Sequence, residues 1–226
     1  MGAAFANRIA AGAALADALA GAASEPGSGL ARRADVVVLG LVRGGVPVAA
    51  EVARRLGVRL DVLVIRKLGV PWAPEVAFGA VGPGEVEVRN DDVARTLSEP
   101  EIEAVVARER AELRRRERIY RGGRPPLVLR GSVAVVVDDG LATGATGRAA
   151  VAVTRALGAA SVVLAVPVAS ARALAALAPL VDELVCPLRP PRFGAVSEFY
   201  QDFHQVSDAE VTTALGAAGV RPTGTV

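Results

Sequence analysis

The sequence predicts an α/β protein with a mainly parallel, twisted sheet flanked by helices and a small hairpin or hood attached to it. Short aliphatic runs rich in Val alternate with segments of helical periodicity along most of the chain. Two of these runs end in glycine-rich or acidic turns that lead directly into a helix. Because ligands of such sheets bind at the carboxyl ends of the strands, these turns are the candidate functional positions.

The composition is that of a folded domain. The chain has 226 residues, of which 52% are hydrophobic, and its formal net charge is +2. This length and apolar fraction predict one domain over residues 1–226 and exclude intrinsic disorder. One Cys and one His, Cys186 and His204, exclude an intramolecular disulfide and a Cys/His zinc cluster. A metal ion would therefore be held by oxygen ligands.

The first segment is predicted to be an N-terminal helix over about residues 3–23. Its larger apolar residues recur at helical spacings, and Asp17 interrupts what could otherwise be the apolar region of a signal peptide. Along the chain, no apolar stretch reaches the ~20 residues that a membrane-spanning helix needs. We therefore expect a cytoplasmic protein that does not interact with membranes.

The first half of the predicted sheet has two strands. Residues 36–42 form a Val-rich strand that is closed by Arg43-Gly44-Gly45 and followed by a helix over residues 46–56. The second strand, residues 60–65, ends at Arg66-Lys67-Leu68-Gly69. A long irregular loop is expected after it, because Pro71, Trp72 and Pro74 oppose regular structure.

A hairpin and a long helix are predicted next. Residues 76–81 and 85–88 are typical of a small hairpin, and Asn90 can cap a short helix. Ser98 and Glu101 form a capping box for an inserted helix over about residues 99–120, which is rich in Arg and Glu. Pairs such as Glu112 with Arg116 and Glu117 with Arg121 lie one turn apart. The interleaved acids favour a solvated face over a nucleic-acid site.

The second half continues the alternation. The predicted elements are a strand over residues 133–137, a helix over 147–157, a strand over 161–166, a helix over 170–177 and a strand over 181–185. The tail over about residues 186–226 is predicted to be irregular. It holds four of the chain's eight aromatic residues, which could form a hood over an acceptor or could be ordinary packing residues: Phe193, Phe199, Tyr200 and Phe203.

The turn after residue 137 has the composition of a phosphate site. The small and hydroxyl residues 142–146 lead into a helix whose first N–H groups have no partner within the helix. Asp138 and Asp139 can accept hydrogen bonds from two vicinal hydroxyls or from a hydrated Mg²⁺. The Walker pattern is excluded because Ala145 stands where it requires Lys, and no G-x-G-x-x-G follows a strand.

The string V-V-V-D-D-G-L-A-T-G-A-T at 135–146 resembles the phosphoribosyl diphosphate (PRPP) motif of the type I phosphoribosyltransferases. L-V-R-G-G-V-P at 41–47 is similar to the family's pyrophosphate loop, and R-K-L-G at 66–69 stands where the family has a basic mobile loop. R-K-L-G-V-P-W-A-P-E-V-A-F-G-A-V and F-Y-Q-D-F-H-Q-V-S-D-A-E-V resemble a bacterial branch with an unassigned acceptor. Val42 in place of Pro and Phe199 in place of Trp depart from that branch, which puts acceptor details in doubt.

The resemblance implies a role for each loop. Asp138 and Asp139 would hold the ribose hydroxyls, and they are candidate protein ligands of an Mg²⁺ held mainly by PRPP. The pyrophosphate would lie on Arg43, Gly44 and Lys67, and Lys67 is the only Lys beside 25 Arg. The 5-phosphate would lie on Ala142, Thr143, Gly144, Ala145 and Thr146, with hydroxyl donors from the two Thr residues. The implied catalytic set is Asp138, Asp139, Lys67 and Arg43.

The acceptor stays open at this stage. Type I enzymes that act on 6-oxopurines resemble one another in having Asp where this chain has Ala142, which cannot transfer a proton. Candidate acceptor contacts are Phe193, Phe199 and Tyr200, and His204 is either a proton carrier or a surface residue. Cys186 is most simply a small buried apolar residue.

The leading hypothesis is a Mg²⁺-dependent transferase that moves ribose 5-phosphate from PRPP to an unidentified small-molecule acceptor, for which a nitrogen nucleophile is one candidate. The alternative is a non-catalytic PRPP-sensing regulator. Arg43 and Lys67 favour the enzyme, because a sensor needs no activation of a leaving group. The resemblance also implies a homodimer.

Overall fold

The computed structural model describes residues 4–21, 29–122 and 124–217. Residues 3, 22 and 23 of the predicted N-terminal helix and residues 218–226 of the predicted tail lie outside these ranges. Within the described ranges, none of the helices combines the length and the apolar character that crossing a bilayer requires.

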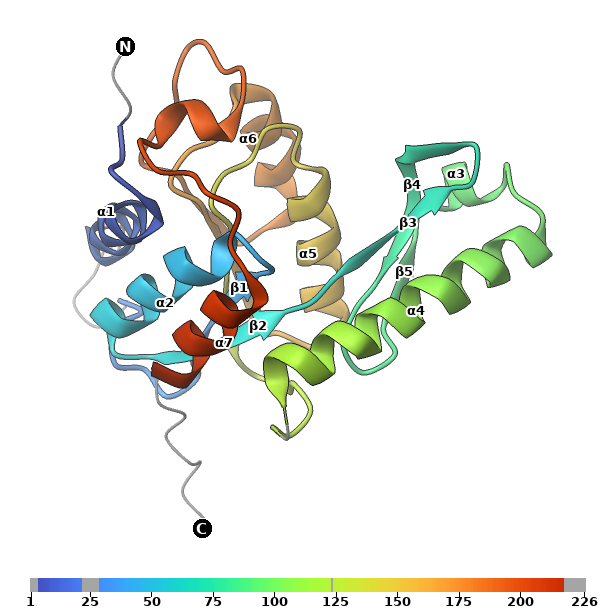
Figure 1. Ribbon diagram of the computed structural model, residues 1–226, viewed down its shortest axis with the longest axis horizontal. Coiled ribbons are helices and arrows are strands. Elements are labelled where there is room, and N and C mark those ends of the chain that lie inside the picture. The colour runs from blue at the N-terminus through green and yellow to red at the C-terminus, as the bar shows by residue number, and fades with distance from the viewer. Residues whose placement is uncertain (1–3, 22–28, 123, 218–226) are drawn as a thin grey trace.

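A five-stranded parallel sheet forms the centre of the molecule (Figure 1). Its strand order is β2-β1-β6-β7-β8. β1 lies between β2 and β6, and Gly40 is the register partner of Val62 on one side and Val137 on the other. The predicted parallel sheet is therefore confirmed. The strands are β1 (Val36–Leu41), β2 (Arg59–Leu63), β6 (Val133–Val137), β7 (Ser161–Ala165) and β8 (Glu183–Val185).

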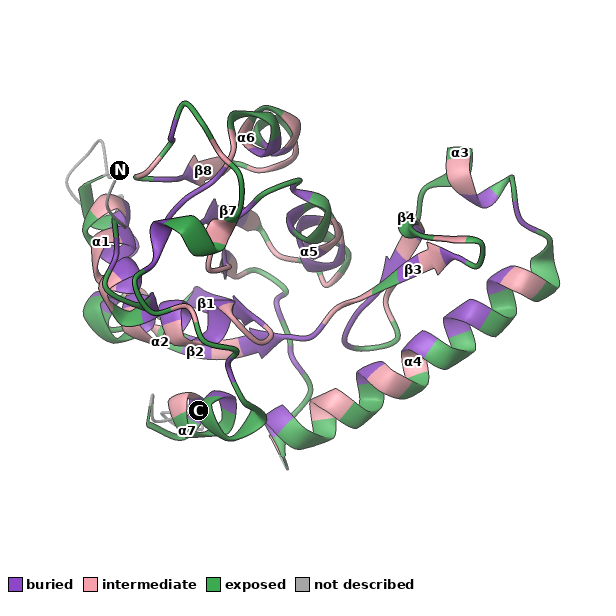
Figure 2. Cartoon of the chain, turned by 45° about the horizontal axis from the view of Figure 1, so that its top comes forward, coloured by how far each residue is buried: buried purple, intermediate pink, exposed green. Residues whose placement is uncertain are grey.

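Helices cover both faces of this sheet. Every residue of β1 is buried (Figure 2). Alternate residues enter two separate apolar cores: Val36 and Val38 face one, and Val37 and Leu39 face the other. This alternation follows from the period of two in a strand. The first core is formed with α1 (Arg8–Gly21), α2 (Gly45–Leu56) and α7 (Asp208–Ala217), and the second with α5 (Ala145–Ala156) and α6 (Ala171–Leu177).

Residues 66–121 form an arm that extends away from the central sheet (Figure 1). The arm has a three-stranded antiparallel sheet in the order β3-β4-β5, with the long α4 packed against β3 and β4. Its elements are β3 (Arg66–Val70), β4 (Ala73–Val81), β5 (Glu87–Arg89), α3 (Asp91–Ala94) and α4 (Glu99–Arg121).

The prediction of a long irregular loop after the second strand is wrong. β3 and β4 instead form a hairpin whose turn holds Pro71 and Trp72. Pro71 lies in the turn, where no ladder N–H is needed, and Pro74 lies where the register shifts between Gly69 and Val70. The prolines are therefore compatible with two strands because they fall at a turn and at an irregularity. The segment that resembles a basic mobile loop is consequently strand β3.

The predicted caps of the arm helices are confirmed. Asn90 accepts a hydrogen bond from the Asp92 N–H at 3.3 Å, and Ser98 with Glu101 forms the capping box of α4. The predicted pair of Glu112 with Arg116 is present at 2.7 Å.

The other predicted pair, Glu117 with Arg121, is not formed in the described structure. Arg121 donates instead to both carboxylate oxygens of Asp61 in β2, at 3.1 and 2.9 Å. This alternative pair ties the end of α4 to the edge strand of the central sheet.

The predicted irregular tail is only partly correct. Within this tail the structure has a short 3₁₀ turn, Val196–Phe199, and the final helix α7. α7 begins with a capping box of its own, because the Ser207 hydroxyl and N–H donate to Glu210 at 2.7 and 2.8 Å, and the Glu210 N–H donates back at 3.2 Å. The Ser-x-x-Glu spacing was thus a helix signal in the sequence.

Candidate active site

Two turns meet at the carboxyl ends of β1 and β6. Asp138 and Asp139 follow β6, and Gly44 and Gly45 follow β1. A Cβ at Gly44 would overlap the Asp139 carboxylate, and a Cβ at Gly45 would lie 2.6 Å from the carbonyl oxygen of Val137. Only glycine therefore allows the two turns to approach this closely.

Both carboxyl groups lie in a desolvated environment. Burial raises the pKa of Asp138 well above its usual range, and the adjacent Asp139 charge adds to this effect. Burial also raises the pKa of Asp139, while the nearby Arg8 guanidinium acts in the opposite direction. Asp138 accepts a hydrogen bond from the Asp139 N–H at 2.9 Å, which fixes the turn.

Arg8 is a site residue that the sequence analysis did not identify. Its Nε and Nη2 both lie 2.9 Å from Asp139 Oδ2, and its Nη1 donates to the carbonyl oxygen of His204 at 2.8 Å. The guanidinium also stacks over Phe203, 4.0 Å from the ring centroid. One signal was present in the sequence, since Arg8 lies on the buried stripe of α1 that continues through Ala11, Gly12, Leu15, Ala16 and Leu19.

We predict that Arg8→Met destabilises the protein by roughly 3 to 5 kcal/mol, because it leaves the Asp139 carboxylate buried without its cation. The free energy of unfolding in urea measures this effect. Arg33→Met, which breaks the exposed pair with Asp35, is the matched control and should cost much less. Equal losses in the two variants would contradict the structural role assigned to Arg8.

The turn between β6 and α5 presents open backbone to solvent. Ala142, Thr143, Ala145 and Thr146 are exposed, whereas Gly144 is buried and has a φ of +79°. The N-cap residue Gly144 has no side chain to cap α5, and the Ala145 N–H makes only a long hydrogen bond of 3.4 Å to Thr143 Oγ1. Such a helix start is suited to an anion, as predicted from the sequence.

Side chains of α7 and α4 support Arg43 in the turn after β1. Arg43 Nη1 lies 3.6 Å from Asp208 Oδ1 at the start of α7, and the hydroxyl of Tyr120 in α4 donates to the same Asp208 atom at 2.7 Å. Burial, with a smaller contribution from Asp208, raises the pKa of Tyr120 to about 12. The peptide bond between Val42 and Arg43 is cis. Neither contact is evident from the sequence, because Asp208 and Tyr120 lie far from Arg43 along the chain.

Lys67 is exposed in β3, opposite Ala80 of β4. Lys67 follows the carboxyl end of β2 in the sequence. Because β2 is parallel to β1, this strand end lies on the same side of the central sheet as the strand ends that precede Arg43 and Asp138. Among the described residues, the side chain of Lys67 makes no hydrogen bond or ion pair. The structure therefore places Lys67 in the first strand of the arm, four residues after β2 ends, with no ion pair to the carboxylates, and its role at the site stays a prediction.

The tail aromatics form a small core beside the site. Phe199 and Tyr200 are buried together with Phe5, and Phe193 packs against Phe199 with ring centroids 5.3 Å apart. The Tyr200 hydroxyl donates to the carbonyl oxygen of Asp139 at 2.6 Å. Phe203 stacks on Tyr200 with ring centroids 4.9 Å apart. These residues thus pack as a core that supports Asp139, and their contact with an acceptor stays a prediction.

His204 and Cys186 have local explanations. His204 is exposed between Asp202 and Glu210, at 2.9 and 2.8 Å, and the hydrogen bonds with Glu210 and Asp202 raise its pKa. Cys186 is buried, and burial raises the pKa of its thiol to about 11. The Cys186 thiol is therefore neutral near pH 7, as a small apolar residue would be.

The described residues contain no group of three or more His, Cys, Asp or Glu side chains that could hold a metal ion. Asp138 and Asp139 supply two carboxylates, and Arg8 already occupies one oxygen of Asp139. Mg²⁺ commonly binds through one or two carboxylates together with substrate phosphates. The residues present therefore fit a Mg²⁺ ion that a diphosphate substrate holds in part.

A family model and two curated relatives all relate this chain to phosphoribosyl transferases. Residues 6–177 match the family model described as phosphoribosyl transferase domain. Two Mycobacterium tuberculosis proteins, MT0597 and Rv0571c, whose names place them among the phosphoribosyl transferases, are each 52% identical over 185 residues, which are 81% of this chain and 42% of theirs. The chain thus spans about two fifths of the length of these relatives.

One solved structure resembles most of the chain. The crystal structure of TT1426 from Thermus thermophilus has 44% sequence identity and a TM-score of 0.82, and the match covers 93% of this chain and 97% of that one. The arm and the tail therefore belong to an architecture that an experimental structure also contains.

Proposed function

Because the chain belongs to the phosphoribosyl transferase domain family, we propose that it transfers ribose 5-phosphate from PRPP to a small-molecule acceptor and releases pyrophosphate. The observation that carries the proposal is the meeting of two turns at the carboxyl ends of β1 and β6. Asp138 and Asp139 lie against Gly44, and the uncapped start of α5 lies directly after them. A diphosphate, a diol and a monophosphate are the groups that such turns suit.

The binding roles follow the chemistry of each turn. The 5-phosphate accepts hydrogen bonds from backbone N–H groups of residues 142–146 and from the hydroxyls of Thr143 and Thr146. Asp138 accepts from one ribose hydroxyl. Asp139 accepts from the other through Oδ1, since Oδ2 is held by Arg8 and Oδ1 has no partner among the described residues. Arg43 and Lys67 face the pyrophosphate.

In the reaction, the bond between the anomeric carbon and the pyrophosphate oxygen breaks, and its electron pair leaves with pyrophosphate. A lone pair of the acceptor forms the new bond at the same carbon, and the acceptor then loses a proton. Positive charge develops on the ribose ring, where the two carboxylates stabilise it, and negative charge develops on the leaving group, where Arg43 and Lys67 do so. Mg²⁺, when bound, would neutralise charge on the pyrophosphate.

The proposal includes Mg²⁺ dependence, a homodimer and an acceptor that brings its own nucleophilic lone pair. Ala142 supports the last point, because it offers no side-chain base next to the ribose. Light scattering measures the oligomeric state.

We predict that Asp138→Asn and Asp139→Asn each weaken PRPP binding by roughly 10- to 100-fold. Each change removes a charged hydrogen-bond acceptor, which contributes ~1.5 to 3 kcal/mol. Titration calorimetry with PRPP and Mg²⁺ measures the effect. Asp35→Asn is the control, because Asp35 is exposed and directly precedes the amino end of β1. This variant should bind PRPP as the wild type does. Wild-type affinity in both site variants would refute this assignment of the PRPP site.

A further inference from the structure

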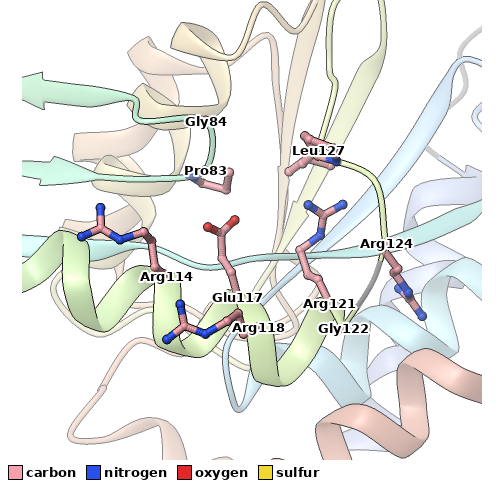
Figure 3. A pocket seen from close by; sticks show the side chains of 10 residues that line it. Pro83, Gly84, Arg114, Glu117, Arg118, Arg121, Gly122, Arg124 and Leu127 are labelled. Carbon is pink, nitrogen blue, oxygen red and sulfur yellow. The ribbon is translucent and has the colours of Figure 1, made fainter.

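A basic cleft of about 380 Å³ lies where the arm joins the central sheet (Figure 3). It is bounded by the end of α4, the turn between β4 and β5, and the segment that leads to β6. Its volume is within the range of small-molecule sites. Its lining includes Pro83, Arg114, Glu117, Arg118, Arg121 and Leu127.

The cationic wall of this cleft is one face of α4. Arg114, Glu117, Arg118 and Arg121 recur at helical spacings of three and four residues, which place them on the same side of the helix. Figure 3 shows the Glu117 carboxylate directed toward Pro83 across the cleft, with arginine side chains on both sides of it. The solvated face predicted from the sequence is therefore, in its last two turns, the wall of a cavity.

The arginines of this wall are not fully neutralised by nearby acids. Arg121 is fixed by Asp61 and by the carbonyl oxygen of Pro125, and its side chain is only 9% exposed. Arg114 has a loose contact with Glu85 at 3.6 Å. Arg118 has no carboxylate partner among the described residues. The cleft is thus lined by the fixed guanidinium of Arg121 and by the less constrained guanidinium groups of Arg114 and Arg118.

Among the described residues that line the cleft, Glu117 is the one acid, and its carboxylate makes no hydrogen bond within the described chain. Burial raises its pKa, with the Arg121 charge acting in the opposite direction. The lining thus holds four arginines and one carboxylate, and this excess of positive charge suits an anion.

The cleft is separate from the candidate active site. Leu127 precedes the amino end of β6, whereas Asp138 and Asp139 follow its carboxyl end. A strand of this length spans roughly 16 Å, at ~3.3 Å per residue. An anion in the cleft would therefore not occupy the turns that we assign to PRPP.

We propose that this cleft is a second binding site, for a small molecule that carries a phosphate group. Arginine forks match the oxygens of phosphate, and Arg121 Nη1, which has no partner among the described residues, is available for such a bond. The apolar side chains of Pro83 and Leu127 line the same space and suit the non-ionic part of such a molecule. This inference does not depend on the proposed transfer reaction.

The test uses the full chain and inorganic phosphate, titrated by calorimetry at low ionic strength. Arg118→Gln should weaken phosphate binding at the cleft by about tenfold or more, because a charge-assisted contact is lost. Glu117→Gln should strengthen it several-fold, because a like charge is removed. Arg115→Gln, on the same helix but outside the lining and paired with Glu112, should leave binding unchanged.

Opposite shifts in the two cleft variants cannot arise from loss of folding, so together they support the site. Phosphate bound at residues 142–146 is insensitive to these substitutions, which separates the two sites. If Arg118→Gln and Glu117→Gln both bind phosphate as the wild type does, the proposal is overturned. If Arg115→Gln weakens binding as much as Arg118→Gln, the effect is one of net charge and the proposal is also overturned.

Discussion

Gly144→Val is expected to abolish PRPP binding while the protein stays folded. Gly144 has a φ of +79°, and a Cβ there would lie 3.1 Å from Leu177 Cδ1, so a branched side chain must displace the backbone of the turn. The N–H groups that we assign to the 5-phosphate would move with it. Calorimetry with PRPP, together with circular dichroism of the variant, measures both parts of the expectation.

Gly131→Val is the matched control for backbone strain. Gly131 has a φ of +75°, and a Cβ there would have no neighbour within 4 Å, so the substitution introduces similar strain far from the candidate site. It should bind PRPP normally. Thr143→Ala should reduce affinity only in part, because it removes one hydroxyl and leaves the backbone donors in place. A folded Gly144→Val variant with normal affinity would show that the phosphate binds elsewhere.

Lys67→Ala is expected to lower kcat by roughly 100-fold or more, with a much smaller change in PRPP affinity. An ammonium group that meets the pyrophosphate as charge builds on the leaving oxygen stabilises the transition state more than the bound substrate. Steady-state release of pyrophosphate, with calorimetry for affinity, separates the two effects. The slow hydrolysis of PRPP serves as the reaction if no acceptor is identified.

Two variants make the Lys67 result specific. Lys67→Arg should recover part of the activity, since a planar guanidinium does not reproduce a point charge. Arg59→Ala, which removes another exposed cation at the amino end of β2, should have wild-type turnover. Unchanged turnover in Lys67→Ala would mean that this residue has no catalytic role.

The sheet and its ligand turns could be predicted because they depend on local pattern. Aliphatic runs such as Val133–Val137 are buried on both faces, so their composition identifies them without knowledge of their neighbours. The glycines and acids that follow the strands are equally local. The hairpin of β3 and β4 was missed because prolines usually oppose strands, and here they fall at a turn and at a register shift.

The supports of the site could not be predicted because they join distant parts of the chain. Arg8 and Asp139 are 131 residues apart, and Tyr120 reaches Asp208 across 88 residues. The apolar stripe of α1 indicates that Arg8 faces inward, but the local pattern does not show that its partner is a carboxylate at the end of β6. The start of α7 is different, because Ser207 and Glu210 form a recognisable capping box.

Release of pyrophosphate from PRPP by the wild-type chain is the most direct test of the proposed transfer. The protein is incubated with PRPP, Mg²⁺ and a panel of bases, amines and small alcohols, and pyrophosphate and the ribosylated product are measured together. We predict that at least one nitrogen nucleophile accelerates release, that product and pyrophosphate form in equal amounts, and that Asp139→Asn suppresses both. PRPP that binds tightly but is neither transferred nor hydrolysed, with every acceptor in the panel, would contradict the proposal that the protein is a transferase.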